Sequence, residues 1–331
     1  MANLSNHLKN VLCGICALTA ASSASALNIL LTNDDGWDKP GIQTLRTAMC
    51  NAGHNVTLVG PAVNQSGRGG SINTGAFSSS SAMTLTKHAS DACGDVFSLA
   101  GPTAPGRFGG TPVDALKAGL QVVLAGQRPD LILSGNNEGQ NLGKPASNSS
   151  GTIGAALQGA YEGVPAIAGS VGVIFAENPA YPSTVASYVP AANFLVSLIA
   201  RLQERFGSSM FPKKVTLLNV NFPVPYNTIK GIKLTNLADR SEIELPLYDR
   251  AAGFPPFPPI ASPSCATLGV NQSCSVGVAF RAVSGPDKVT NADTDAHAEG
   301  YISITPMDGD MTATTGTGAL VGLIGSLAIV P

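Results

Sequence analysis

The sequence has little charge, and neither sign is in excess. Lys and Arg number 19 against 21 Asp and Glu, and only 12% of the 331 residues are charged. Nucleic acids and acidic membrane surfaces recruit proteins through clustered Lys and Arg, which this chain lacks. The composition therefore predicts a small-molecule partner and no nucleic-acid duplex.

Histidine is also scarce, and familiar catalytic motifs are missing. The four histidines include no H-x-x-x-H pair, so a zinc hydrolase of that kind is not expected. The sequence contains no G-x-S-x-G nucleophile elbow and no G-x-x-x-x-G-K-[ST] phosphate loop. Imidazole and thiolate metal sites fit this chain poorly, so oxygen ligands are the ones to look for.

Residues 1–26 have the features of a secretory signal peptide. Lys9 precedes an apolar core at 11–21, and Ala24-Ser25-Ala26 fits an A-x-A cleavage site. An uncleaved anchor is the alternative, but the apolar core is shorter than the roughly 20 residues that a spanning helix needs. We expect a secreted or periplasmic protein that begins near Leu27 and has no membrane span after processing.

Four of the six cysteines lie beyond this segment, and in an exported chain they are expected to form disulfides. Cys265 and Cys274 bracket a short loop of small and polar residues, which makes them the first choice for a pair. Cys50 and Cys93 would then pair by elimination. Sequence alone permits all three pairings of four cysteines.

Strand and helix patterns alternate through the first two thirds of the chain, which predicts an α/β fold with a doubly wound, mostly parallel, Rossmann-like sheet. Apolar strand patterns begin at 29 and recur at 56–59, 130–133, 165–171, 215–220 and 229–234. Helical patterns run from Pro40 to before Gly53 and over 112–125, 152–162 and 184–205. Residues 72–100 predict only an irregular β excursion.

The last ninety residues look different. Residues 248–263 are rich in proline and predict an extended arm. Residues 276–283 and 301–305 alternate as strands of an antiparallel piece, and the apolar tail at 319–330 is expected to pack in the fold or a subunit interface. We therefore divide the chain into a signal peptide at 1–26, a Rossmann-like catalytic core at 27–240, and an arm, β extension and tail at 241–331 that serve oligomerisation.

The most informative stretch is Asn33-Asp34-Asp35-Gly36, where the first strand ends. Two adjacent carboxylates are costly to bury unless a cation offsets their charge, and carboxyl ends of parallel strands are where such sheets bind ligands. A plain Asp-Asp-Gly turn is the alternative. Ser66 and Asn137 follow two further strands, and with the acids they form an all-oxygen set suited to one Mg²⁺, Mn²⁺ or Ca²⁺.

A second candidate element is the helix start at Ser150-Gly151-Thr152. The free backbone N–H groups of a helix N-terminus suit an anion such as phosphate. The alternative is an ordinary N-cap, with glycine and alanine chosen for close packing.

The order of these motifs resembles the SurE survival-protein phosphatases, which are metal-dependent 5′/3′-nucleotidases. The likeness covers nearly all of the chain beyond the signal segment. The matching motifs are Asn33–Gly36 with Pro40-Gly41-Ile42, Asn64-Gln65-Ser66-Gly67, Gly110-Thr111-Pro112-Val113-Asp114, Ser134-Gly135-Asn136-Asn137, Asn141-Leu142-Gly143, Ser150–Thr152, 218–223 and 300–306.

The resemblance implies a function and a set of site residues. The metal ligands would be Asp34, Asp35, Ser66 and Asn137. The phosphate would be held by Asn64, Gly67 and the turn formed by Ser150, Gly151 and Thr152. The activity would be hydrolysis of nucleoside 5′/3′-monophosphates and simple phosphate monoesters by a water that the metal activates. A dimer or tetramer is also implied.

Some assignments stay open. The signal peptide, the cysteines and residues 245–290 depart from the family pattern, so its acid/base residues map only loosely onto Asp293, Asp295 and His297. His297 could protonate the leaving group or be an ordinary surface residue. Trp37 could stack on a base or simply pack beside the acidic turn. An exported protein that binds phosphate or a nucleotide without catalysis is the competing function.

Overall fold

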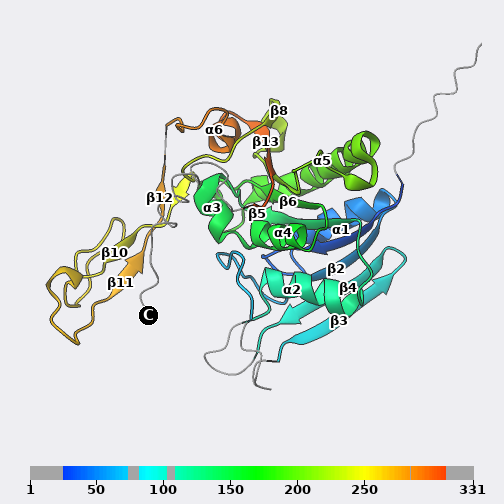
Figure 1. Cartoon of the computed structure of the whole chain (residues 1–331). Helices are drawn as coiled ribbons and strands as arrows, with labels where there is room; N and C mark the ends of the chain where they lie inside the picture. The colour runs from blue at the N-terminus through cyan, green and yellow to red at the C-terminus, as the bar shows by residue number, and fades with distance from the viewer. Residues whose placement is uncertain (1–24, 74–81, 103–108, 284, 311–331) are drawn as a thin grey trace, which may run out of the picture.

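The computed structural model describes residues 25–73, 82–102, 109–283 and 285–310. The predicted signal segment up to residue 24 and the apolar tail lie outside these ranges. Figure 1 shows a layered core, from which a narrow arm projects to one side.

A nine-stranded sheet forms the centre of the core. Six neighbouring strands, from β4 to β7 in space, run parallel to one another. At one end of this group β3 pairs antiparallel with β4, and at the other end β13 pairs antiparallel with β7. The last strand, β8, is parallel to β13. In spatial order the strands are β3 (Thr84–Asp91), β4 (Gly94–Ala100), β2 (Asn55–Pro61), β1 (Asn28–Thr32), β5 (Leu131–Glu138), β6 (Ala166–Val171), β7 (Leu217–Phe222), β13 (Tyr301–Met307) and β8 (Gly231–Leu234). The predicted α/β class with a mostly parallel sheet is confirmed.

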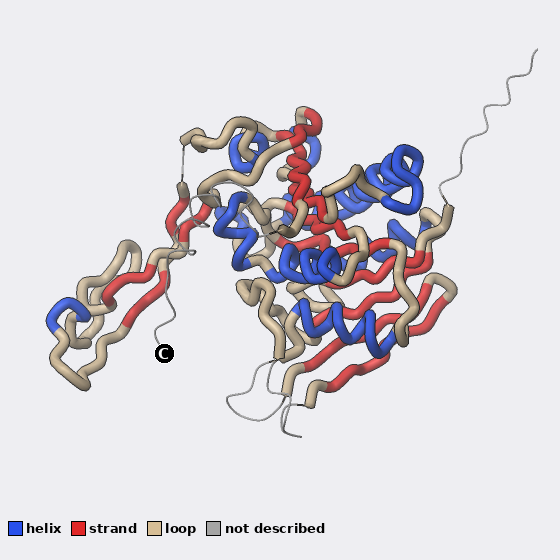
Figure 2. Tube along the Cα trace, in the orientation of Figure 1, coloured by secondary structure: helices blue, strands red, loops and turns tan. Residues whose placement is uncertain are grey.

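Helices cover both faces of the sheet, as Figures 1 and 2 show. They are α1 (Pro40–Asn51), α2 (Pro112–Ala118), α3 (Gly143–Ser149), α4 (Gly151–Tyr161), α5 (Pro182–Phe206) and α6 (Asp293–Ala298), with a π-helical turn at Gly119–Val123 after α2. Short 3₁₀ turns lie at Phe175–Glu177, Gly207–Ser209, Tyr226–Thr228 and Cys265–Thr267.

Each face of the sheet has its own hydrophobic core. Ile29 and Leu31 of β1 pack with α1 and α5, whereas Leu30 between them packs with α2 and α4. Successive strand residues point to opposite faces, so a strand buried on both sides reads as an unbroken apolar run. This burial holds β1 rigidly at the centre of the sheet, directly before the two adjacent acids.

One helical stretch among the described residues, Pro182–Ser209, is long and apolar enough by length and composition to cross a membrane. Buried side chains of this stretch, including Tyr188, Leu195 and Ile199, pack in the core that β1 shares with α1. A core helix meets the same criteria, and this packing is what the structure shows for α5.

Two sequence expectations need correction. Residues 84–100, expected to be irregular, form the regular antiparallel strands β3 and β4 of the main sheet. β3 is exposed along nearly its whole length, so it shows no alternation of apolar and polar residues. The strand at Tyr301–Met307, expected in an antiparallel piece with residues 276–283, instead lies inside the main sheet, antiparallel to β7 and parallel to β8.

The arm consists of two small antiparallel sheets, which pair β9 (Ile243–Glu244) with β12 (Arg281–Ala282) and β10 (Leu247–Asp249) with β11 (Val276–Val278). The ring of Tyr248, in β10, packs near those of Phe254 and Phe257, at centroid distances of 5.4 and 6.3 Å. The Cys265–Cys274 disulfide closes the far loop. Figure 2 shows these strands standing away from the core.

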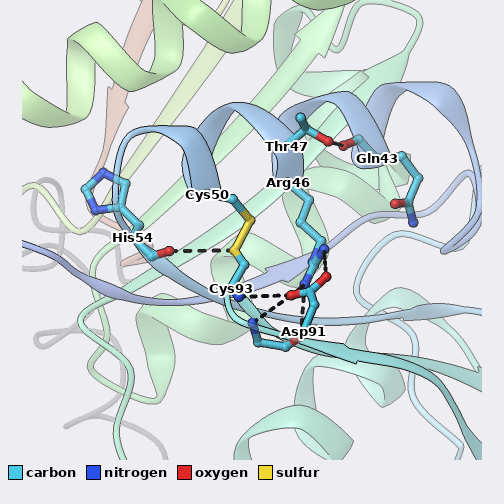
Figure 3. Close-up of a disulfide and its surroundings, with 8 residues drawn as sticks. Gln43, Arg46, Thr47, Cys50, His54, Asp91 and Cys93 are labelled. Atoms are coloured by element: carbon cyan, nitrogen blue, oxygen red, sulfur yellow. Dashed lines mark hydrogen bonds and ion pairs between the residues drawn. A yellow bond between two sulfur atoms is a disulfide. The ribbon is translucent and has the colours of Figure 1, made fainter.

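The second disulfide joins the core elements α1 and the β3–β4 turn (Figure 3). Cys50 near the end of α1 bonds to Cys93, and one turn earlier Arg46 donates two hydrogen bonds to the Asp91 carboxylate, at 3.0 and 2.7 Å. The arginine side chain also reaches the carbonyl of Gly94. These are the pairings that the sequence favoured, and the core disulfide fastens the edge of the sheet to α1.

Candidate functional site

The predicted ligand residues come from loops at one edge of the sheet. Asp34 and Asp35 follow β1, Ser66 lies beyond the end of β2, and Asn137 is the residue before the last one of strand β5. Because β1, β2 and β5 are parallel neighbours, their carboxyl ends lie together. Both acids and Asn137 are buried, with 3%, 7% and 7% exposure, respectively.

The Asp34 carboxylate is held by the start of α4. The Thr152 hydroxyl donates to its Oδ1 at 2.6 Å, and the backbone N–H groups of Gly151 and Thr152 also donate to it. Burial raises the pKa of Asp34, and these hydrogen bonds oppose the rise. The sequence predicted that these N–H groups bind a phosphate. In the structure they face the Asp34 carboxylate, so a role in phosphate binding stays a prediction.

The Asp35 carboxylate has fewer compensating partners. The backbone N–H of Glu138 donates to its Oδ2 at 2.9 Å. Burial, followed by the charge of Asp34, raises the pKa of Asp35 well above its ordinary value. The negative charge of Glu138 raises this pKa further, and the positive charge of Lys39 lowers it. Two adjacent buried acids, each with a raised pKa, form a site that a cation would stabilise.

Asn137 and the Ser66 loop complete the edge. The Asn137 amide nitrogen donates to the carbonyl of Gly139 at 2.6 Å, which leaves its Oδ1 as a free acceptor. The Ser66 loop is tied to the acids, because the Gln65 N–H donates to the Asp34 carbonyl at 2.7 Å. Asn64 Oδ1 accepts from the Ser66 N–H, so this side chain shapes the loop.

The donor chemistry fits a hard divalent cation. In the described ranges, no three side chains of His, Cys, Asp or Glu gather into a metal-binding group. A metal at this edge would be held by two carboxylates, supplemented by the amide oxygen of Asn137 and the hydroxyl of Ser66. Oxygen-only sets of this kind bind Mg²⁺, Mn²⁺ or Ca²⁺ rather than softer metals.

The N-terminus of α4 is also a conventional helix cap. Ser150 Oγ accepts from the Ile153 N–H at 3.2 Å, and Gly154 N–H donates to the Ser150 carbonyl. A Cβ atom on Gly151 would lie 2.7 Å from Asp34 Cβ and 2.9 Å from its Oδ2. Glycine is therefore required for the helix to approach the carboxylate this closely.

Asp293 and Asp295 bind backbone groups. The buried carboxylate of Asp293 accepts from the N–H groups of Gly143, Ala238 and Thr294, and thereby joins three segments. Burial raises the pKa of Asp293, and these bonds oppose the rise. Asp295 accepts from the Asp287 N–H. Both carboxylates are engaged in holding loops in place.

His297 lies against the base of the arm. Its Nδ1 is 3.3 Å from Glu242 Oε1, and Glu242 also accepts from the Gln140 amide at 2.9 Å. His297 Nε2 is enclosed and has no partner among the described residues. Its assignment as a proton donor stays a prediction.

Trp37 stacks on His88, with 3.7 Å between the ring centroids, so packing against His88 covers one face of the Trp37 ring.

Sequence reasoning missed Glu138 and Tyr188. Glu138 follows Asn137 directly, and its Oε2 accepts from the Tyr188 hydroxyl at 3.3 Å. Its proximity to an expected ligand was the only sequence signal. Tyr188 is 3% exposed on α5, and burial raises its pKa far above the ordinary value. No local pattern could link it to a strand fifty residues earlier.

Comparison with known proteins identifies the family. The family model of survival protein SurE matches residues 29–244. A protein of Thermosipho africanus named 5′-nucleotidase SurE is 35% identical over 85% of this chain and 91% of its own length. The chain belongs to the SurE family.

Other SurE proteins show the same extent of likeness. The protein of Gloeobacter violaceus, also named 5′-nucleotidase SurE, is 33% identical over 89% of this chain and 94% of its own length. The crystal structure of the SurE protein from Aquifex aeolicus covers 89% of this chain and 99% of its own chain, with a TM-score of 0.65 at 28% identity. The α/β fold is therefore that of a SurE protein.

Proposed function

We propose that this SurE-family protein is a 5′-nucleotidase that depends on a divalent cation and hydrolyses nucleoside 5′- and 3′-monophosphates and simple phosphate monoesters. The observation that carries this proposal is the buried Asp34–Asp35 pair with Asn137 at the carboxyl edge of the sheet. The relatives named 5′-nucleotidase SurE support the same reaction class. Mg²⁺, Mn²⁺ and Ca²⁺ are the candidate cations.

Asp34, Asp35, Asn137 and Ser66 would hold the cation. When bound, a divalent cation polarises the phosphoryl group and lowers the pKa of a nearby water. The chain keeps the carboxylates in place by the Thr152 hydroxyl and by the N–H groups of Gly151, Thr152 and Glu138. Fixed ligands avoid reorganisation during the reaction, which is a major source of catalysis at such sites.

A cavity at the base of the arm, near the end of β5, is the candidate space for a leaving group. A cavity of about 450 Å³ is lined in part by Gln140, Phe175, Glu242 and Thr294. Gln140 is three residues beyond Asn137, and no more than about 10 Å of extended chain separates them. This volume is in the range for small-molecule sites and would accommodate a nucleoside.

The first test combines activity and metal. Purified protein is assayed with p-nitrophenyl phosphate and a panel of nucleoside monophosphates, with each cation and with chelator. We expect turnover that chelator abolishes and that added cation restores. A protein that binds phosphate or a nucleotide without turnover would be the non-catalytic alternative, and hydrolysis of only diesters or carboxylic esters would refute the reaction class.

Variants then test the ligands. Asp34→Asn and Asp35→Asn should each lower kcat/KM by about a thousandfold, roughly 4 kcal/mol of transition-state stabilisation, with the fold retained. Asn137→Ala should weaken metal affinity less, because a neutral ligand is lost. Asp38→Asn is the matched control, because Asp38 is exposed on the same loop and pairs with Lys39. Near-normal turnover of Asp35→Asn at saturating metal would disprove the assignment.

We also propose export and self-association. The apolar core of residues 11–21 and the Ala24–Ala26 site support secretion or a periplasmic location, and N-terminal sequencing of the mature protein tests the cleavage near Ala26. Exposed apolar side chains on the arm support a homodimer or homotetramer.

A further inference from the structure

The residue expected to begin the processed chain is already fixed in the fold. Leu27 is buried in the hydrophobic core, and its backbone N–H donates to His54 Nδ1 at 3.1 Å. Its carbonyl accepts from the Asn55 N–H at 2.8 Å. The two residues before it, 25–26, are exposed. The boundary between exposed and buried chain therefore falls at the predicted cleavage site.

His54 is suited to accept the hydrogen bond from Leu27. Its side chain is buried, and burial lowers the pKa of the imidazole. The ring is therefore neutral at pH 7 and above, and a neutral imidazole has one nitrogen that only accepts. Because Nδ1 accepts from Leu27, the ring proton lies on Nε2.

A cavity of about 560 Å³ lies beside Leu27 and is lined in part by Ser25, Asp130, Gln203 and Glu204. The Gln203 amide nitrogen donates to the Ser25 carbonyl at 3.0 Å. Its Oε1 is buried and has no hydrogen-bond partner among the described residues. An unpaired buried acceptor is costly, so this oxygen is suited to a donor that the unprocessed chain does not supply.

Removal of the signal segment supplies such a donor. An endoprotease that hydrolyses the Ala26–Leu27 bond uses one water, whose oxygen bonds to the Ala26 carbonyl carbon as the C–N bond breaks. Both water protons pass to the Leu27 nitrogen, which becomes an ammonium. One N–H stays on His54, and the new ones point to the place that the Ala26 carbonyl leaves, beside the cavity that Ala26 lines.

The charges around this cavity favour a cation. Asp130 Oδ2 accepts from the N–H of Asn28, the residue after Leu27, at 2.8 Å. Glu204 is a second acid in the lining, and Arg201, the one cation among the described lining residues, is paired with it at 2.7 Å. Hydrogen bonds from a charged donor are about twice as strong as neutral ones, so an ammonium holds the start of β1 more firmly than an amide.

We propose that the signal segment is cut between Ala26 and Leu27 and that the α-ammonium released at Leu27 is bound by His54 Nδ1 and Gln203 Oε1, so that processing stabilises the folded protein. The inference rests on the proposed export and is independent of the phosphatase activity. It gives the N-terminal ammonium a binding site of its own, at the opposite end of β1 from the acids.

Thermal unfolding tests the ammonium site. A chain that begins at Leu27 is compared with one that begins at Ala26, which has the same net charge but keeps an amide at Leu27. We expect the shorter chain to melt about 2 °C higher, as one additional charge-assisted hydrogen bond implies for a domain of this size. Equal melting temperatures would overturn the proposal.

Variants made in both chains identify the acceptors. Gln203→Ala should shrink the difference in melting temperature, and His54→Leu should reverse it, because a buried ammonium without its acceptor costs more than an amide. Gln127→Ala is the control, since Gln127 is exposed and lies outside the cavity lining. A difference that survives both Gln203→Ala and His54→Leu would refute the assigned acceptors.

Two further measurements separate this inference from export. An amine-reactive ester should modify the N-terminus of the Leu27 chain about tenfold more slowly than that of the Ala26 chain, because the bound amine reacts only after local opening. Equal rates would overturn the ammonium site. N-terminal sequencing of exported protein should begin at Leu27, and another start would overturn the cleavage site. If the chain keeps its signal segment while the shortened chains differ as expected, export fails and the ammonium site stands.

Discussion

The contact between Gly151 and Asp34 makes one residue-scale prediction. Alanine at 151 would push its Cβ against Asp34, so the carboxylate or the start of α4 must shift. We expect Gly151→Ala to lower kcat/KM by about a hundredfold, because misplaced ligands lose catalysis steeply. Gly70→Ala is the control, since a Cβ there meets nothing within 4 Å. Equal activity of both variants would show that the close approach is not needed.

Asp91 gives a prediction about pH. The Arg46 guanidinium, by its hydrogen bonds, lowers the pKa of Asp91 to about 2. A lowered pKa in the folded state stabilises the protein above the ordinary pKa, and this stabilisation is lost as pH falls toward 2. Asp91 is half exposed, so solvent screens the pair.

We expect Asp91→Asn to reduce the free energy of unfolding by about 1 kcal/mol at neutral pH. The difference from the parent should shrink between pH 4 and pH 2, as measured by urea unfolding. A difference that stays constant over this range would show that the charge of Asp91 is not what stabilises the turn.

Residue-level prediction worked where local sequence determined the environment. Asp34 and Asp35 could be singled out because two acids directly follow an apolar strand, and burial of both is what the structure shows. Asp293 could not be interpreted in this way, because two of its three backbone partners, Gly143 and Ala238, lie 150 and 55 residues away in the sequence. Its three hydrogen bonds exist only in the folded chain.

At the scale of elements, the two disulfides should differ in their effect on stability. The Cys50–Cys93 bond closes a loop with a sequence separation of 43, and the Cys265–Cys274 bond one of only 9. The chain-entropy relation gives about 4 kcal/mol for the first and about 2.6 kcal/mol for the second. Cys50→Ala with Cys93→Ala should therefore destabilise the core more than the corresponding arm variant, as judged by urea unfolding.

The arm variant serves as the matched control for this comparison. Its loop is the shorter one, so its loss should lower the midpoint of the unfolding transition less than loss of the core disulfide. If both double variants lower the midpoint of the core transition equally, loop length is not the governing factor.

Central elements were predictable from sequence, and edge elements were not. Strands such as β1 and β6 are buried on both faces and appear as apolar runs. β3 has only one neighbouring strand and is mostly exposed, so its Ser, Thr and Lys residues give no burial pattern. β3 is recognised as a strand only through its pairing with β4, and the disulfide between its turn and α1 holds it at the edge of the sheet.

The helix predicted at 112–125 is α-helical only to Ala118 and continues as a π-helical turn.

For the whole molecule, the arm predicts self-association. Its exposed apolar side chains are Leu245, Leu247, Phe257, Ile260, Val270, Val276, Val278 and Phe280. An apolar surface of this kind on a projecting segment is expected to bury itself on a neighbouring subunit. Light scattering should show a dimer or tetramer at micromolar concentration.

Leu247→Ser combined with Phe280→Ser should shift this equilibrium toward the monomer. Leu247 is 70% exposed and Phe280 is 71% exposed, and both would be buried in the contact between subunits. Val122→Ser is the control, since Val122 is similarly exposed at 65% but lies on the core. A parent protein that is monomeric under these conditions would remove the proposed role of the arm and leave the metal site unaffected.

The order of the disulfides along the chain has a consequence for biosynthesis. The four cysteines beyond residue 26 pair in consecutive couples along the chain, Cys50 with Cys93 and Cys265 with Cys274. If the chain is exported as proposed and is oxidised from its N-terminus as it emerges, Cys50 and Cys265 each meet their native partner as the next cysteine to appear. An oxidant alone should then yield the native pairs, with no isomerase required to correct mispaired bonds.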